Sequence, residues 1–513
     1  MFVLNRKLEF FICFVLLFVG NIVGYAFGID VNAINLFIAV MCFLLFMPMV
    51  KLSRILAFCL LFITAGLCYF GIKAMYFASF GFCALVGANV WLGKDYSRKN
   101  LSLMLILVAV FFNLSFISNT WFNWVQYDIL SCYNYIEYII DNNFMFWNEN
   151  PLLSRPSYSA YHPILHFFVA GMFMKLAEVI SGSWDVAKEV VQVVFCFYMF
   201  VYYIFANRII EFFKFDKTVH LVALGFVCFF PIFNAMAGYF NNDGMLLMLQ
   251  CMSVYYALMY YRDDSKKDLW LMVLCIVLAC LTKLSGVVVL PMVGVIFLIK
   301  LWNKRELKCF YELLMVGMVI LLGVALWPMY QYFVLGIDYN FVPPQEHLSL
   351  VKYSYWERFN PIKAFIYEKM FYDDFGVNLW ETMTKTAIFG QWNFSVKADD
   401  VFWLVIAVNY CYKALLGIII GGIGYILIKR RWVEWWLVLI LMLGVLVAHI
   451  IFGIMHPYMC NMDFRYVAIL NLPMALILGM VMQNISNVWR YIITSVVGVL
   501  AVSSTIVWWW IVL

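Results

Sequence analysis

Long apolar runs separated by short polar stretches recur along the whole chain. A helix needs about 20 residues to cross the hydrocarbon core of a bilayer, and it satisfies its own backbone polar groups there. Membrane-crossing helices are predicted at residues 9–28, 34–50, 53–70, 72–93, 101–120, 187–206, 220–240, 244–261, 268–284, 286–302, 310–333, 401–428, 433–455, 466–483 and 491–511. The pattern predicts an all-α polytopic membrane protein with about fifteen transmembrane helices.

Composition agrees with this prediction. Hydrophobic residues make up 66% of the 513 residues and charged residues only 12%, whereas about 25% of the residues in a soluble domain are charged. The net charge of +5 is spread over short basic clusters between the apolar runs. Such clusters are typical of signals that orient a protein in a membrane. We therefore expect a lipid bilayer as a partner and no nucleic acid.

The basic clusters orient the predicted helices. Arg6 and Lys7, residues 51–54 and residues 94–99 fall on one side, which the positive-inside rule assigns to the cytoplasm. The N-terminus is then inside and the C-terminus outside. No small-residue cleavage pattern follows the signal-like first run, so we interpret it as a retained span. These features and the short loops favour a bacterial inner (cytoplasmic) membrane, with the polar stretches of interest on its outer, periplasmic side.

Two outer loops are predicted, at residues 121–186 and 336–400. In the first, the run at 163–180 competes with the run at 187–206 for a single crossing. We assign 187–206 to the crossing and 163–180 to a juxtamembrane helix at the outer interface, where its His and Lys residues cost less to bury. The second loop exceeds the ~15 residues of an ordinary connection, which favours structure or function of its own.

Two aspartates on the outer side are candidate catalytic residues. Asp128 precedes an amphipathic helix whose apolar face would contain Ile129, Tyr133, Ile136 and Ile140, and whose polar face would contain Asn134, Glu137 and Asp141. Asp243 begins a hydrophobic helix. Each could simply cap its helix. Two carboxylates beside apolar walls could also provide a general base.

Basic side chains on the same side are candidates for binding an anion. Lys283 lies between two apolar runs and Arg465 directly precedes another; either could hold a phosphate, although Lys283 could also snorkel and Arg465 could pair with Asp463. Lys413, inside the span at 401–428, is a further possible site residue. His162 and His166 lie four positions apart and would share a helix face. Because no third ligand accompanies them, we predict no metal site; a divalent metal is conceivable but not indicated.

Five short motifs in this order resemble those of the membrane-embedded GT-C glycosyltransferases, in particular the aminoarabinose transferase and protein mannosyltransferase superfamily. The motifs are Asp128 with Tyr135-Ile136, Tyr161-His162-Pro163, Asn242-Asp243, Thr282-Lys283 with Pro291, and Asp463-Arg465-Tyr466. The resemblance covers about residues 101–490. It divides the chain into an N-terminal group of four transmembrane helices (1–100), a GT-C-like catalytic core (101–490) and a C-terminal transmembrane helix (491–513). Relatives often have a Pro-Pro pair at His162-Pro163 and an adjacent acidic pair at Asp128.

The resemblance implies an inverting glycosyltransferase. A sugar would move from a polyprenyl (undecaprenyl-type) phosphate donor to an acceptor hydroxyl on a glycan, lipid or protein of the cell envelope. Asp128 would act as the base with help from Asp243, and the donor phosphate would be held by Lys283, Arg465, His162 and Tyr161, with His166 and Lys413 as further possibilities. No cofactor is implied.

Two other functions fit parts of the pattern. A transporter or flippase of lipid-linked saccharides would favour charged or broken helices near the bilayer midplane and inverted repeats. Lys413 is the main charged residue of this kind, and no repeat is evident. A polysaccharide polymerase or ligase would use a lipid diphosphate donor and favour Arg-rich outer loops. The outer loops contain few arginines.

Overall fold

The computed structural model describes residues 6–26, 97–120, 128–144, 158–334, 348–366, 376–390, 401–429 and 433–512, together with Gly28, Gly336 and short pieces of residues 55–93. Nearly all of these residues are helical. The described residues include no strand, only an isolated antiparallel bridge between Ser349 and Tyr458. The prediction of an all-α fold is confirmed. The predicted spans at 34–50 and 53–70, and most of the span at 72–93, lie outside the described residues apart from short helical pieces.

Eight helical segments of the described residues are long and apolar enough to cross a membrane. They are Arg98–Ile117, Trp184–Phe212, Leu284–Lys304, Leu307–Phe333, Phe402–Lys429, Val433–Met455, Met459–Gln483 and Asn487–Trp508. These segments confirm a polytopic membrane protein. The number of about fifteen crossings and the three-part domain division stay predictions.

The described helices are mostly α-helices, with four short 3-10 helices among them. In chain order they are α1 (Arg6–Ala26), α5 (Arg98–Asn119), α6 (Ile129–Asp141), η1 (Tyr158–Tyr161), α8 (Leu165–Ser181), α9 (Trp184–Val190), α10 (Gln192–Phe212), α11 (Lys217–Cys228), α12 (Phe233–Met236), α13 (Asp243–Asp263), α14 (Lys266–Thr282), η2 (Leu284–Val289), α15 (Leu290–Lys304), α16 (Leu307–Phe333), α17 (Tyr355–Phe359), α18 (Lys363–Ile366), α19 (Leu379–Phe389), α20 (Phe402–Lys429), α21 (Val433–Met455), η5 (Met459–Met462), η6 (Phe464–Leu470), α22 (Asn471–Gln483) and α23 (Asn487–Val512).

The predicted crossing at 220–240 is wrong as a single continuous helix. Helix α11 ends at Cys228, and the four-residue α12 follows after a break. Pro231 lies in this break; it has no backbone N–H and its ring is incompatible with the interior of a helix. The N–H of Ile232 donates instead to the carbonyl of Ala387 in α19, 3.2 Å away. The broken segment is thereby held to a helix more than 150 positions later in the chain.

The competing runs at 163–180 and 187–206 form different kinds of helix. The second run lies within the segment Trp184–Phe212, which is long and apolar enough to cross a membrane. The first run forms the 17-residue helix α8, which is not among the eight candidate spans. This difference agrees with assigning the crossing to residues 187–206.

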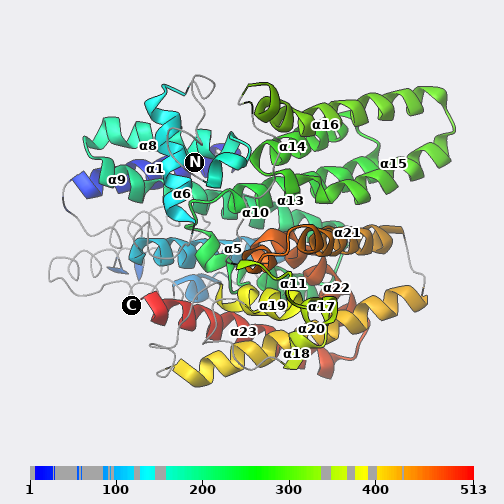
Figure 1. Cartoon of the computed structure of the whole chain (residues 1–513). Helices are drawn as coiled ribbons and strands as arrows, with labels where there is room; N and C mark the ends of the chain where they lie inside the picture. Colours follow the sequence, from blue (N-terminus) through cyan, green and yellow to red (C-terminus); the bar gives the residue numbers. More distant parts are fainter. Residues whose placement is uncertain are drawn as a thin grey trace.

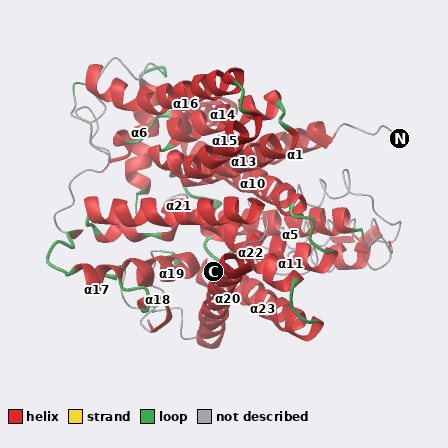
Figure 2. Cartoon of the chain, turned by 90° about the vertical axis from the view of Figure 1, so that its right-hand side faces the viewer, coloured by secondary structure: helices red, strands yellow, loops and turns green. Residues whose placement is uncertain are grey.

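The helices form two groups separated by α21. Helices α13 to α16 lie on one side of α21, and α19, α20 and α23 lie on the other (Figure 1 and Figure 2). Helix α10 packs against α13, α11 and α5, and α1 packs against α8 and α9. Because α21 contacts both η2 and η6, it joins the two groups near Lys283, which directly precedes η2, and Arg465 of η6.

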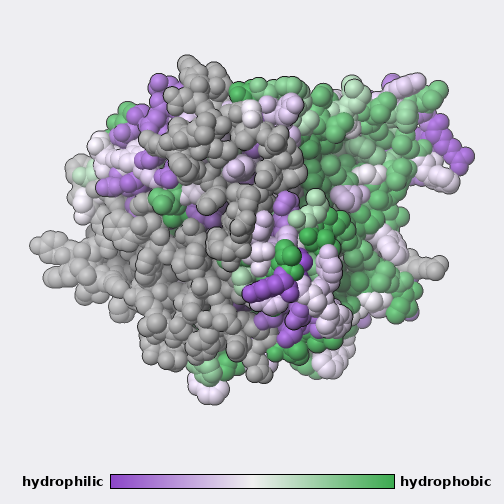
Figure 3. All heavy atoms as spheres, viewed as in Figure 1, coloured by the Kyte–Doolittle hydropathy of each residue, from purple (hydrophilic) through white to green (hydrophobic). Residues whose placement is uncertain are grey.

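Turns predicted to be cytoplasmic are joined to one another by ion pairs. Lys304 contacts Asp264 and links the turn after α15 to the turn after α13, and the Arg490 guanidinium lies 2.8 Å from Asp216. Figure 3 shows a hydrophobic surface over α13 to α16 that gives way to hydrophilic side chains at the α15–α16 turn. The pairing of these turns agrees with the common side that the basic clusters predict.

Candidate active site

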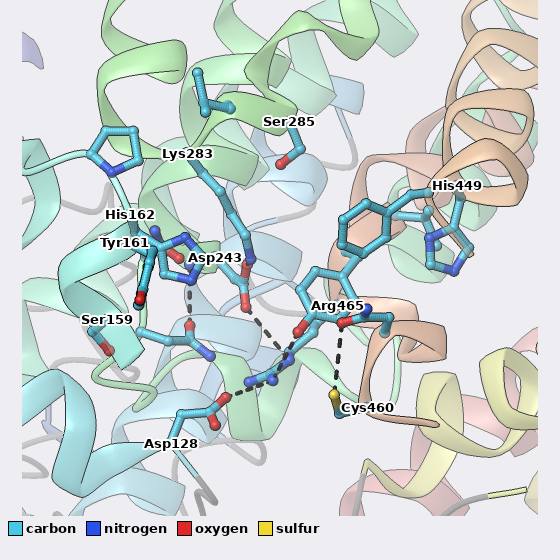
Figure 4. A pocket seen from close by; sticks show the side chains of 18 of the residues that line it. Asp128, Ser159, Tyr161, His162, Asp243, Lys283, Ser285, His449, Cys460 and Arg465 are labelled. Atoms are coloured by element: carbon cyan, nitrogen blue, oxygen red, sulfur yellow. Dashed lines mark hydrogen bonds and ion pairs between the residues drawn. The ribbon is translucent and has the colours of Figure 1, made fainter. Parts of the chain in front are cut away.

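A cavity of about 410 Å³ lies where α6, η1, the start of α13, η2, α21 and η6 meet. Its charged and polar lining residues include Asp128, Tyr161, His162, Asn241, Asp243, Lys283, Ser285, His449 and Arg465 (Figure 4). An apolar wall completes it, formed by Val287, Val288, Leu348, Val445, Ala448 and Phe452. The cavity therefore has a charged end and an apolar side.

Asp128 stands at the N-terminus of α6 but does not cap the helix. Its side chain makes no capping hydrogen bond; instead its Oδ2 accepts a hydrogen bond from Arg465 Nη2 at 2.7 Å. Burial alone would raise the pKa of Asp128, but the charge and hydrogen bond of Arg465 outweigh it and hold the pKa below its ordinary value. The side chain is still 51% exposed. Asp128 is therefore an ionised carboxylate that another molecule can reach.

Asp243 forms a buried ion pair with Lys283. The two side chains are only 2% and 10% exposed, and Lys283 Nζ lies 2.6 Å from Asp243 Oδ1. The side-chain oxygen of Asn241 accepts a hydrogen bond from the backbone N–H of Asp243, and Asn242 Nδ2 donates to the carbonyl of Thr282 at 2.8 Å. These bonds fix the start of α13 to the end of α14, so the carboxylate and the ammonium meet.

The turn that follows Lys283 depends on Gly286. Lys283 ends α14 in an extended conformation, and the chain then turns into η2. A Cβ atom at Gly286 would lie 2.7 Å from the backbone of both Ala279 and Cys280, a distance that real Cβ atoms do not adopt. Only glycine lets η2 fold back this closely onto α14. The close packing of η2 on α14 therefore explains the glycine in the sequence TKLSG.

Arg465 connects the two acidic groups. Besides its bond to Asp128, its Nε lies 3.8 Å from Asp243 Oδ2 and 3.7 Å from Asp463 Oδ2. Asp463 also accepts the backbone N–H of Arg465, which fixes the start of η6. The ring centroid of Tyr466 lies 4.4 Å from Lys283 Nζ, within range of a cation–π interaction. The cluster thus includes the cations Lys283 and Arg465 and the carboxylates Asp128, Asp243 and Asp463.

Tyr161 and His162 reach the cavity from η1. The carbonyl of Tyr161 accepts hydrogen bonds from Trp327 Nε1 at 3.0 Å and Gln331 Nε2 at 3.3 Å in α16. Desolvation by the cavity walls, reinforced by the charge of Lys283, lowers the pKa of His162 to about 4. His162 is therefore neutral near pH 7 and provides hydrogen bonding rather than charge.

The other two possible site residues lie elsewhere. His166 is buried in α8 with its Nε2 2.9 Å from the carbonyl of Phe240, and it does not line the cavity. Lys413 is in α20, with its ammonium 5.9 Å from the Tyr410 ring centroid, also away from the cavity. His162 and His166 thus do not act as a pair. Within the described ranges, no group of three or more His, Cys, Asp or Glu side chains is arranged to hold a metal ion.

The polar face predicted for α6 is only partly correct. Asp141 is exposed, but Tyr133 lies on the side of Glu137 rather than with the buried isoleucines. The Tyr133 hydroxyl donates to Glu137, and Trp184 Nε1 donates to both side chains. The network joins α6 to α9 outside the cavity, so Glu137 has a structural role.

Sequence reasoning did not identify His449 and Ser285 as site residues. His449 lies inside the apolar run at 433–455, and Ser285 lies two positions after Lys283. An ionisable residue inside a membrane span is itself a signal of function, and this signal could have identified His449. The signal for Ser285 is weak because a serine near a span end is common.

Comparison with known proteins supports the predicted resemblance. Residues 161–329 match the family model described as dolichyl-phosphate-mannose-protein mannosyltransferase. The matched segment is about a third of the chain and contains Tyr161, His162, Asp243 and Lys283, whereas Asp128 and Arg465 lie outside it. No curated protein matches the chain. The predicted likeness to the GT-C membrane glycosyltransferases is confirmed, and the match indicates a glycosyltransferase-type function.

Proposed function

We propose that this protein transfers a sugar from a polyprenyl phosphate donor to an acceptor hydroxyl at the outer face of a membrane. The observation that supports this proposal most is the cluster around Arg465, in which two cations stand beside an accessible carboxylate in one cavity. Cations stabilise a departing phosphate, and a carboxylate can remove a proton from a hydroxyl. The family match supports the glycosyltransferase class.

The proposed reaction is a single displacement. Asp128 accepts the proton of the acceptor hydroxyl while the acceptor oxygen forms a bond to the anomeric carbon. The bond from that carbon to the phosphate oxygen breaks, and its electron pair leaves with the phosphate, whose charge changes from about −1 to −2. Attack opposite to the leaving group inverts the configuration at the anomeric carbon. Asp243, which is only 2% exposed, positions Lys283 rather than meeting the acceptor.

Charge balance requires an exchange of partners when the donor binds. Each of the two cations is already paired with a carboxylate, and the neutral His162 adds no charge. A phosphodiester anion binds favourably only if it takes a cation from a carboxylate. Arg465 is the cation to move, because its partner Asp128 is half exposed and can be solvated, while the partner of Lys283 is buried. When Arg465 moves from Asp128 to the phosphate, Asp128 becomes more basic, at the step in which the acceptor hydroxyl needs a base.

The apolar wall suits the lipid part of this donor. Val287, Val288, Val445 and Phe452 line the cavity beside the charged end, and an isoprenoid chain needs apolar surface next to a polar pocket. The basic clusters favour the outer side of the membrane for this cavity, and the signal-like first span and the short loops favour a bacterial inner membrane. The acceptor is then a glycan, lipid or protein of the cell envelope.

The proposal is tested in proteoliposomes with radiolabelled undecaprenyl-phosphate monosaccharides and an extract of the source cell envelope. The full-length chain should move label into the extract, and Asp128→Asn should lower the rate by about 10²- to 10⁴-fold, the usual contribution of a general base. Wild-type rates for Asp128→Asn would refute the base assignment. Movement of label across the bilayer without a new glycosidic bond would instead establish a transporter.

A further inference from the structure

Besides Asn241 Nδ2 and Arg465 Nε at the charged end of the cavity, two polar atoms in its wall have no hydrogen-bond partner among the described residues. They are Nε2 of His449 in α21 and the hydroxyl of Ser285 in η2. His449 is only 5% exposed, and both residues line the cavity. Figure 4 shows both on the side of the cavity away from Asp128. A buried polar atom without a partner loses its hydration and gains nothing in return, so these atoms need an explanation.

Packing does not explain His449. Its neighbours along α21 are Val445, Ala448 and Phe452, which form the apolar wall of the cavity. Its ring centroid lies 6.5 Å from that of Tyr466, a contact that a phenylalanine would make equally well. An imidazole in this place gives the wall hydrogen-bonding capacity that an aromatic hydrocarbon would lack.

Packing does not explain the Ser285 hydroxyl either. The carbonyl of Ser285 accepts a hydrogen bond from Gln250 Nε2 at 3.0 Å, so the backbone of η2 is anchored to α13 without the side chain. An alanine would preserve that anchor. The serine hydroxyl thus makes no hydrogen bond within the described fold, and Ser285 lines the cavity.

The position of the two side chains indicates what they bind. Tyr466 is a common neighbour: Lys283 Nζ lies 4.4 Å from its ring centroid and the His449 ring lies beside it. A group attached to a phosphate on Lys283 and Arg465 is thus adjacent to the wall with His449 and Ser285. The side chains of this wall carry no fixed charge, and neutral hydroxyl groups match it because each can both donate and accept.

Building on the proposed function, we propose that His449 and Ser285 bind the ring hydroxyls of the donor sugar and thereby select which sugar is transferred. The polar atoms of the wall then gain partners only when a sugar is present. A site built to hydrogen-bond a hydroxyl discriminates strongly against a ligand that lacks it, because its buried polar atoms remain unpaired. His449 and Ser285 are specificity residues, separate from the phosphate-binding cations.

Binding measurements on the purified full-length chain in detergent test this proposal. The probes are undecaprenyl phosphate without a sugar and the same lipid carrying mannose, glucose, galactose, N-acetylglucosamine, arabinose or aminoarabinose. At least one sugar-bearing lipid should bind the wild type about 10-fold tighter than the other sugar-bearing lipids, which carry the same single phosphate charge; this is the effect of about 1.4 kcal/mol of added hydrogen bonding. His449→Phe should abolish this gain without changing the affinity for bare undecaprenyl phosphate, and His449→Gln should restore part of it.

A matched pair of serines controls for loss of a buried hydroxyl. Ser285→Ala should reduce the gain, whereas Ser102→Ala should not, since Ser102 also has a buried hydroxyl without a partner but lies in α5 outside the cavity. The proposal is overturned if all the sugar-bearing lipids bind the wild type equally, or if both cavity variants weaken the bare lipid and the sugar-bearing lipids equally. Failure of the wild type to bind bare undecaprenyl phosphate would instead refute the proposed function.

Discussion

Arg465 Nη2 lies 2.7 Å from Asp128 Oδ2, although the two residues are 337 positions apart in the chain. The same guanidinium approaches Asp243 at 3.8 Å. The proposed base and the proposed phosphate ligands therefore share one cation. In the proposed reaction, binding of a phosphate anion and activation of the base are therefore coupled through this side chain.

Asp128→Asn should bind the donor phosphate more tightly while transferring sugar more slowly. The neutral amide removes the carboxylate that competes for Arg465, so the affinity for bare undecaprenyl phosphate should rise about 3- to 10-fold, as expected for the loss of one partly exposed charge contact. Binding is measured on the purified chain in detergent at constant ionic strength.

Asp141→Asn is the matched control for this affinity change. Asp141 ends α6, the helix that Asp128 precedes, and its side chain lies outside the cavity. The substitution Asp141→Asn removes the same charge farther from the cavity, so the affinity for undecaprenyl phosphate should stay close to that of the wild type. Weaker binding of undecaprenyl phosphate by Asp128→Asn would contradict the exchange of partners.

Lys283→Met should destabilise the protein strongly. It leaves the Asp243 carboxylate buried with its 2.6 Å partner removed, and breaking a buried pair in this way costs about 3–5 kcal/mol. The double variant Lys283→Met with Asp243→Leu should recover much of the loss, because the buried carboxylate that lost its hydrogen-bonded cation is removed as well. The midpoint of thermal unfolding in detergent reports both effects.

Lys304→Met provides the comparison with an accessible ion pair. Lys304 contacts Asp264 with both side chains more than a third exposed, and such pairs contribute only about 0–1 kcal/mol. Its unfolding midpoint should therefore hardly change. Equal destabilisation by the two lysine substitutions would show that burial of the Lys283–Asp243 pair is not important.

His162 should make the protein less stable as the solution becomes acidic. Its pKa in the folded protein is about 4 and its ordinary value is 6.5, so below pH 6.5 the unfolded chain binds a proton that the folded protein resists. The contribution of His162 to stability therefore falls from pH 6.5 down to about 4 and then levels off.

His162→Asn should flatten this dependence. Between pH 7 and pH 5 its unfolding midpoint should fall less than that of the wild type, while other titrating groups, including His166, affect both proteins alike. The same low pKa predicts no break in the wild-type transfer rate near pH 6.5 from His162. Parallel stability curves for the two proteins would contradict a neutral His162 in the fold.

Gly286→Ala should shift η2 and thereby the position of the Lys283 side chain in the cavity. Its Cβ would meet backbone atoms of Ala279 and Cys280 at 2.7 Å, and overpacking of this kind costs about 1–3 kcal/mol. Both the unfolding midpoint and the rate of sugar transfer should fall. Gly294→Ala is the control, because nothing lies within 4 Å of the added methyl group and alanine is the better helix former. A Gly286→Ala protein with normal stability and transfer would show that the close approach of η2 to α14 is not required.

Hydrophobic patterning predicted most helices but not their interruptions. The runs at 401–428 and 433–455 became α20 and α21 almost without change. The run at 220–240 is broken near Pro231, where the next backbone N–H binds a carbonyl of α19. An apolar window averages over such a break, and the compensating partner comes from a distant part of the chain, so local sequence could not predict it.

The sequence by itself determined that the chain is a polytopic helical membrane protein and that its unusual polar residues gather at a few apolar-run ends. The energetic cost of polar groups in a bilayer decides both features, and this cost is readable from composition and spacing. It could not decide whether Asp128 and Asp243 cap helices or bind cations, since both uses place an aspartate at a helix start. Only the tertiary structure decided this, by bringing Arg465 to Asp128 and Lys283 to Asp243, and by placing His449 in the same cavity. Such contacts depend on how helices pack across long sequence separations, which no local pattern records.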